Sequence, residues 1–128
     1  MEYIAHSDGE RVQTLKEHLE GTARLAEAFA GRFGKGDWGY CCGMLHDIGK
    51  YSDDFQKKIR ENSTAMVDHA TAGAKVCWQK GGLYGFLSYC IAGHHAGLPD
   101  TGGTQDTGSA PTLEGRKRKR IPDFSAYQ

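Results

Sequence analysis

The chain has 128 residues, of which 38% are hydrophobic and 18 are glycine, and this length fits one domain rather than several. No run approaches the roughly 18 consecutive apolar residues of a membrane-spanning helix, and no signal peptide opens the chain, so we expect a cytoplasmic protein without membrane contact. The formal net charge is zero, but residues 1–115 hold 11 basic and 15 acidic residues, a net charge of −4 that argues against nucleic-acid binding by surface charge alone, unless bound metals supply positive charge.

Helical periodicity runs through most of the chain. Thr14 and Glu17 form a capping box, and the apolar residues that follow recur at spacings of three and four, which predicts a helix. No stretch alternates with a period of two for long enough to predict a sheet. We therefore expect an all-α bundle of about five helices, with approximate ranges 14–34, 37–49, 52–59, 68–79 and 83–94.

The character of the chain changes after Pro99. Residues 100–115 (DTGGTQDTGSAPTLEG) are rich in Gly, Thr, Ser and Asp and contain one large apolar residue, which predicts a loop or a disordered segment. We expect a helical core over residues 1–99 and a flexible loop with a basic tail over residues 100–128, in which residues 121–128 (IPDFSAYQ) form no helix of their own. The basic run at residues 116–120 (RKRKR) is expected to be solvated and disordered, or else to follow a DNA backbone.

Histidines mark the candidate functional site. Any single histidine is more often structural than a ligand, but five of the six here stand within the first helix or near helix ends, and they include a His-Asp and a His-His dipeptide. This combination predicts shared metal binding by His18, His46, His69, His94 and His95, together with Asp47. We expect Asp47, His69, His94 and His95 to converge on one point.

Imidazole suits iron, nickel, manganese, cobalt, copper and zinc, and a carboxylate can bridge two cations. Two such ions, about 3.5–4 Å apart, can activate a water and hold both oxygens of a phosphoryl transfer. Lys50 lies four residues beyond His46, so on a continuous helix it shares that face and can meet a phosphate oxygen. The alternative for Lys50 is an ordinary cation at a helix C-terminus.

The residues HDIGK at positions 46–50 resemble the H-D-x-G-K core of the HD superfamily of metal phosphohydrolases. Together with VDHATAGA and HHAGLPD, and with GERVQTLKEHLEGTARLAEAFA near the start, they resemble the HD nuclease domain of the CRISPR-associated type I helicase–nuclease, particularly its compact, type I-C-like form. The resemblance extends along the whole chain.

This resemblance implies an HD-superfamily helical bundle that cuts single-stranded DNA with two divalent transition metals, which would be iron, nickel, manganese or cobalt, or else zinc. Its first metal would be held by His18, His46 and Asp47, and its second by Asp47, His69, His94 and His95. Asp47 and Lys50 would be the catalytic residues. The implied partners are single-stranded DNA, a helicase domain or subunit, and an RNA-guided surveillance complex.

The chain departs from this family at its C-terminal end. The family closes its first metal site with an aspartate on a later helix, and Asp123, the only acidic residue after Glu114, follows a proline in a stretch without helical periodicity. We therefore expect a fragment truncated at its C-terminus, with impaired nuclease activity. Such a fragment would leave part of its core uncovered and is expected to form a homodimer or a larger species.

Two other interpretations remain open. The chain can be another HD phosphohydrolase, either a nucleotidase or a cyclic-dinucleotide phosphodiesterase, although the latter would carry a G-Y-P signature near its paired histidines, and HHAGLPD has none. It can also be a catalytically silent fragment that binds a partner or dimerises. Metal content together with cleavage of single-stranded DNA separates an enzyme from a silent fragment.

Overall fold

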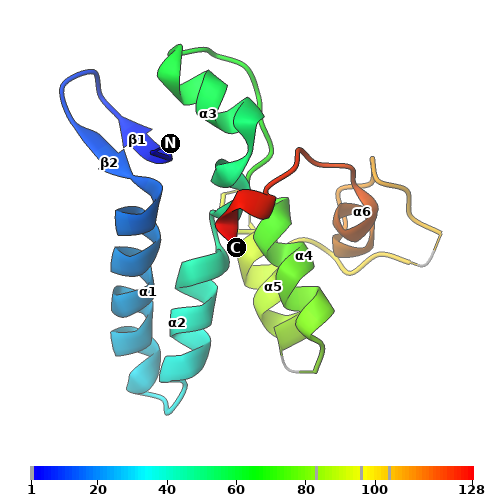
Figure 1. The fold of residues 1–128 in the computed structure, drawn as a ribbon. Helices are drawn as coiled ribbons and strands as arrows, with labels where there is room; N and C mark the ends of the chain where they lie inside the picture. The colour runs from blue at the N-terminus through cyan, green and yellow to red at the C-terminus, as the bar shows by residue number, and fades with distance from the viewer. Residues whose placement is uncertain (1, 83, 96, 104) are drawn as a thin grey trace.

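The chain begins with a short hairpin and continues as helices (Figure 1). A computed structural model describes residues 2–82, 84–95, 97–103 and 105–128. Its elements are β1 (Ile4–Ser7), β2 (Val12–Thr14), α1 (Leu15–Gly31), α2 (Gly36–Leu45), a 3-10 turn (Ile48–Tyr51), α3 (Asp53–Arg60), α4 (Thr71–Lys80), α5 (Tyr84–Ala92), α6 (Leu113–Arg118) and a second 3-10 turn (Ser125–Tyr127). The expected helical bundle is confirmed, and the described residues form six α-helices.

The hairpin corrects the expectation that the chain contains no sheet. Strands β1 and β2 pair antiparallel, but they have only four and three residues, so alternation is too brief to recognise in the sequence. The turn between them is held by Asp8, whose carboxylate accepts hydrogen bonds from the backbone N–H groups of Glu10 and Arg11 at 3.0 and 2.6 Å. Strand β2 leads directly into α1, so the hairpin stands at the N-terminal end of that helix (Figure 1).

Helix starts agree with the sequence better than helix ends do. The capping box of Thr14 and Glu17 forms as predicted, whereas α2 stops at Leu45, four residues before the expected end at Gly49. The backbone leaves the helix at Asp47, with φ −120° and ψ 21°, and continues as a 3-10 turn. Leu83, the expected start of the fifth helix, lies outside the described residues. Within the described part of the chain, no helix is both long and apolar enough to cross a membrane.

Two helix pairs form the core: α1 packs along α2, and α4 along α5 (Figure 1). The first pair approaches closely because Gly43 has no side chain, and a Cβ there would lie 2.4 Å from the Cα of Ala23. Leu45, at the end of α2, packs against both hydrophobic clusters of the molecule. The residues that follow Leu45 are therefore placed between the two helix pairs.

Residues 113–118 form α6, where the sequence predicted a flexible loop and a basic tail. Leu113 is fully buried in the cluster formed by α4 and α5. The basic run is also largely engaged within the molecule, because Lys119 pairs with Asp68 at 2.6 Å and the ammonium of Lys117 lies 3.6 Å from the ring centroid of Trp78. A sequence rich in Lys and Arg suggested solvation, but Arg116, Lys117 and Lys119 find partners on and beside α4.

Replacing Leu113 tests whether this segment is part of the folded core. We expect Leu113→Ala to lower the free energy of unfolding by about 2–5 kcal/mol, because it removes a fully buried side chain. Leu25→Ala is the matched control, since Leu25 on α1 is 63% exposed and its truncation should change stability by less than about 0.5 kcal/mol. Urea denaturation measures both, and equal effects of the two substitutions would contradict a docked α6.

Candidate metal centre

The candidate site gathers around the carboxylate of Asp47, which is only 3% exposed. Its Oδ2 faces His18 from α1 and His46, which follows the last residue of α2. Its Oδ1 faces His69, which precedes α4, and His94, which follows α5. One buried carboxylate therefore connects histidines from both helix pairs.

The first group consists of His18, His46 and Asp47. The Nε2 atoms of the two histidines lie 2.8 and 3.2 Å from Oδ2 of Asp47 and 3.1 Å from each other. All three ligand atoms lie within 4.8 Å of one another. Three side chains of metal-ligating type thus present their donor atoms to one small volume.

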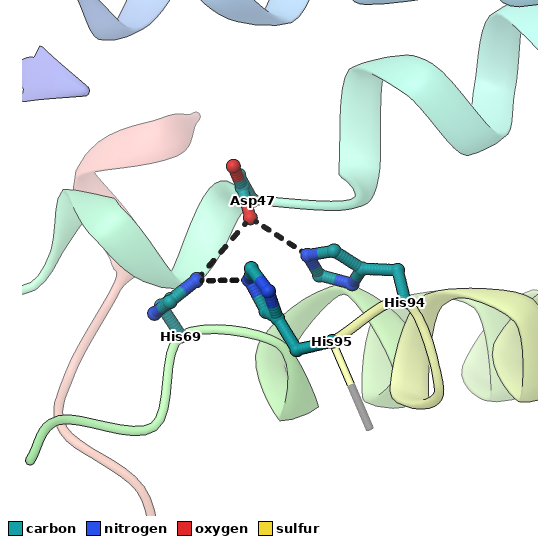
Figure 2. Close-up of side chains that lie close together, drawn as sticks. All are labelled: Asp47, His69, His94 and His95. Carbon is teal, nitrogen blue, oxygen red and sulfur yellow. Dashed lines mark hydrogen bonds and ion pairs between the residues drawn. The ribbon is translucent and has the colours of Figure 1, made fainter. Parts of the chain in front are cut away.

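The second group consists of Asp47, His69, His94 and His95, and Figure 2 shows the three histidines turned toward the carboxylate and toward one another. Nε2 of His94 lies 3.1 Å from Oδ1 of Asp47, and Nε2 of His69 lies 3.6 Å from the same atom. Nε2 of His95 lies 2.7 Å from that of His69. These four residues converge as the sequence suggested.

Helix ends orient two of the histidines. Nδ1 of His46 lies 2.6 Å from the carbonyl oxygen of Gly43, and Nδ1 of His94 lies 2.6 Å from that of Ile91. Each carbonyl stands near a helix C-terminus, where the last carbonyls lack helical partners. Because a carbonyl only accepts, Nδ1 carries a proton in both rings. Nε2 therefore donates to Asp47 when the ring is protonated and offers its lone pair to a cation when the ring is neutral.

The donor set fits divalent transition metals. Imidazole nitrogen and carboxylate oxygen suit manganese, iron, cobalt, nickel and zinc alike. Nitrogen–metal bonds are about 2.0–2.1 Å long, so two ligands of one ion lie up to about 4 Å apart, close to the 4.8 Å within which each group falls. Different oxygens of Asp47 face the two groups, so this carboxylate could serve one ion in each group.

Electrostatics keep Asp47 ionised. Burial alone would raise the pKa of its carboxyl, but hydrogen bonds from His18, His46 and His94 outweigh burial and hold the pKa well below its usual value. Lys50, itself 4% exposed, adds an ammonium 3.2 Å from Oδ2. This ammonium also donates to the carbonyl oxygen of Ala5 on β1, at 3.3 Å, so the hairpin and the carboxylate share one cation.

The histidines of the second group differ in their affinity for protons. Burial lowers the pKa of His69 to about 4, and the charges of Lys50 and His95 act in the same direction. Burial also lowers the pKa of His95. Burial works to lower the pKa of His94, but the pKa is raised because the protonated ring donates a hydrogen bond to Asp47. His69 is thus neutral at pH 7, the form in which histidine binds a metal.

The glycine of the HDIGK motif has a steric role. A Cβ placed on Gly49 would lie 2.4 Å from the carbonyl oxygen of His69 and 2.7 Å from its Cα. Only a residue without a side chain lets the backbone of His69 approach the turn that follows Asp47. Gly49 therefore allows His69 to come within reach of the carboxylate.

Asp68 fixes the turn on the other side of His69. Its carboxylate accepts hydrogen bonds from the backbone N–H groups of Ala70 and Thr71, at 3.2 and 3.1 Å, and from the Thr71 hydroxyl at 2.6 Å. Lys119 pairs with the same carboxylate. The basic run predicted to be solvated thus supports the segment that carries a histidine of the second group.

Two clefts meet at the second group. The basic cleft, of about 710 Å³, lies between the hairpin and α3 and is lined by His6, Lys50, Lys58 and Arg60, among others. The tail cleft, of about 660 Å³, is lined by residues that include Met66, Leu98, Pro111, Arg116 and Lys119. His69 and His95 line both, so the metal centre lies where the two clefts join.

All residues that the sequence suggested as ligands meet at this centre, and Lys50 meets it as well. Asp123 is not in either group; its carboxylate accepts a hydrogen bond from the backbone N–H of Ser125. One histidine was missed: His6 on β1 packs edge-on against His18, with ring centroids 4.8 Å apart. The strand that carries His6 is too short to be recognised, so the sequence offered no way to place it.

Comparison with protein families decides the identity of the fold. The family description "HD domain" matches residues 15–124, which includes every residue of both groups. The chain belongs to the HD domain family. No curated protein matches the chain. Family and geometry together make it an HD-domain metal-dependent phosphohydrolase with a His/Asp metal-binding cluster.

Ligand substitutions should separate the two groups. We expect His46→Ala to abolish binding of one ion and His69→Ala that of the other, while Asp47→Ala removes both, because only Asp47 belongs to both groups. Loss of a group that only orients a ligand typically weakens metal binding about 10–100-fold, so loss of a ligand itself should weaken binding of that ion by about 100-fold or more. Ions per chain, measured by plasma mass spectrometry after dialysis against cobalt, report the outcome. If His46→Ala and His69→Ala displace the same ion, the division into two groups is wrong.

Gly49→Ala tests the steric role of the motif glycine. The added methyl group should push His69 away from Asp47, costing about 1–3 kcal/mol of stability and weakening the second ion more than the first. Gly21→Ala is the matched control, because a Cβ on Gly21 in α1 meets no atom within 4 Å; it should stabilise the helix by about 0.5–1 kcal/mol. Thermal unfolding and cobalt titration measure the two effects. Unchanged cobalt binding in Gly49→Ala would argue against the contact.

Proposed function

We propose that this phosphohydrolase cleaves phosphodiester bonds of single-stranded DNA, as the nuclease domain of a CRISPR-associated type I system. The motifs HDIGK, VDHATAGA and HHAGLPD support this assignment by their resemblance to that family. The observation that carries it is the junction of the basic and tail clefts at His69 and His95. A centre open on two sides accommodates a strand that enters by one cleft and leaves by the other.

The two ligand groups suggest a role for each side chain. His18, His46 and Asp47 would hold one ion, and Asp47, His69, His94 and His95 the other. When bound, two such ions activate a water and hold the attacking and leaving oxygens of a phosphoryl transfer. The first group offers three protein ligands, the number that catalytic zinc sites use to leave a position open.

Lys50 is proposed to bind the reacting phosphate. It lines the basic cleft, and its ammonium lies 3.2 Å from Oδ2 of Asp47, next to both groups. A buried ammonium in this position can donate to a phosphate oxygen that gains charge in the transition state. The 3-10 turn at Ile48–Tyr51 replaces the helical turn expected from the sequence but keeps Lys50 beside Asp47.

The proposed partners follow from the same resemblance. A nuclease of this family works beside a helicase, as a domain or a separate subunit, which an RNA-guided surveillance complex recruits to DNA. The helicase would deliver single-stranded DNA to the junction of the two clefts. The tail cleft is lined by Met66 and Leu98, which are 96% and 74% exposed. It therefore offers apolar contacts to bases or to a partner.

Substrate comparison tests the proposal. Protein loaded with manganese or cobalt should cut circular single-stranded DNA, which has no ends, and chelation should abolish the cut. Mononucleotides and cyclic dinucleotides should react far more slowly. Preferred hydrolysis of either would instead identify a nucleotidase or a cyclic-dinucleotide phosphodiesterase. No hydrolysis of any substrate by a dimeric chain that holds its metals would identify a silent interaction module.

Lys50→Met should lower kcat on single-stranded DNA by about 10²–10³-fold, the usual cost of losing one donor to a developing charge. Metal content should remain that of the unmodified protein, because Lys50 is not a ligand. Lys16→Met is the control, because Lys16 is exposed on α1, and it should leave kcat unchanged. A Lys50→Met variant that retains its metals and keeps at least a tenth of the rate would exclude this role.

A further inference from the structure

The basic cleft contains a second lysine that the proposed mechanism does not use. We propose that Lys58 binds the phosphate next to the scissile one, so that the basic cleft is a subsite for a polynucleotide strand. This inference rests on the proposed nuclease function. It explains how the enzyme would prefer a polynucleotide to a single phosphodiester.

The walls of the basic cleft are held at a fixed separation. Gln56 on α3 is 1% exposed, and its side-chain amide pairs with both backbone groups of Ile4 on β1, accepting from the N–H at 2.8 Å and donating to the carbonyl at 2.9 Å. The same amide donates to the carbonyl oxygen of Lys50 at 2.8 Å. Hairpin, α3 and the turn after Asp47 are thereby joined, so the cleft exists before any substrate binds.

The ring of Phe55 lies near Lys58, Lys50 and His69, and so limits the distance between Lys58 and the metal centre. The ammonium of Lys50 lies 5.3 Å from the Phe55 ring centroid, that of Lys58 lies 5.7 Å from it, and the ring of His69 lies 5.3 Å from it. The two ammoniums are therefore at most about 11 Å apart, the sum of their distances to the common ring. Two cations within this limit can contact phosphates of the same strand, since a positive groove that follows the backbone is how proteins bind single strands.

The ammoniums of Lys50 and Lys58 differ in whether they already have an acidic partner in the protein. Lys50 is paired with Asp47 inside the protein. Lys58 makes no ion pair within 4.0 Å among the described residues and is half-buried at the cleft wall. Asp8 is the acidic residue that lines this cleft, and its carboxylate is engaged by the backbone of the hairpin turn. Asp54 and Glu61 line a neighbouring cleft with Lys58, but neither lies within 4.0 Å of its ammonium. The ammonium of Lys58 is therefore available to a phosphate in the basic cleft.

The test uses Lys58→Gln, with Lys57→Gln as the matched control. Lys57 is the neighbouring lysine on α3, is exposed, and does not line the basic cleft. The substrates are an oligothymidylate and bis(4-nitrophenyl) phosphate, a single phosphodiester without a neighbouring phosphate. We expect Lys58→Gln to raise KM for the oligothymidylate about five- to tenfold and to leave hydrolysis of the small diester within about twofold. Lys58→Arg should restore the oligothymidylate KM, and Lys57→Gln should alter neither substrate.

Binding measurements keep this inference separable from the nuclease proposal. Fluorescence anisotropy of a labelled oligothymidylate across salt concentrations should show that Lys58→Gln weakens binding and lowers the magnitude of the salt slope by about one. That result together with an inactive unmodified protein would reject the nuclease function but retain the subsite. Equal effects of Lys58→Gln and Lys57→Gln, or no oligothymidylate binding by the unmodified protein, would overturn the subsite. A fall in small-diester hydrolysis as large as that for the oligothymidylate would also overturn it.

Discussion

The fold of this protein depends on one buried negative charge. Removing a carboxylate from water costs several kcal/mol unless partners replace the lost hydration, and Asp47 is almost fully buried. Histidines from both helix pairs and the ammonium of Lys50 surround it. Lys50 in turn donates to the carbonyl oxygen of Ala5 on β1. The hairpin is thereby connected through Lys50 to the carboxylate that the helices surround. Tertiary structure and candidate active site are therefore maintained by a common set of contacts.

The residues that can bind a metal were recognisable from the sequence, but only the structure shows which of them lie in the same group. His46 and Asp47 are adjacent in an otherwise apolar stretch, and His94 and His95 follow an apolar helix, so both pairs attract attention. Which oxygen of Asp47 faces which histidine depends on the backbone turn at Asp47, where helical periodicity stops. His6 and Gln56 act through a hairpin of seven paired residues at most, for which local patterns carry little information.

The basic run shows how composition misleads when it is considered without its partners. Five successive cations favour solvation in an isolated segment, yet Arg116 donates to the hydroxyl of Thr71 at 2.7 Å and Lys119 pairs with Asp68. Asp68 and Thr71 lie on either side of the turn that begins α4, 45 to 51 residues away in sequence. No local pattern can reveal contacts at that separation, whereas the Thr14 cap, whose partner is three residues away, was predictable.

The support that Lys119 gives to the His69 turn also has a consequence for biosynthesis. The ligands are distributed between residues 18 and 95, and the cation that steadies one of them comes at residue 119. During synthesis the ribosome releases the chain from its N-terminus, so a nascent chain exposes all six ligands before their support exists. Contacts this distant in sequence also form late, because closing long loops is entropically costly. The centre thus becomes complete only when nearly the whole domain has left the ribosome.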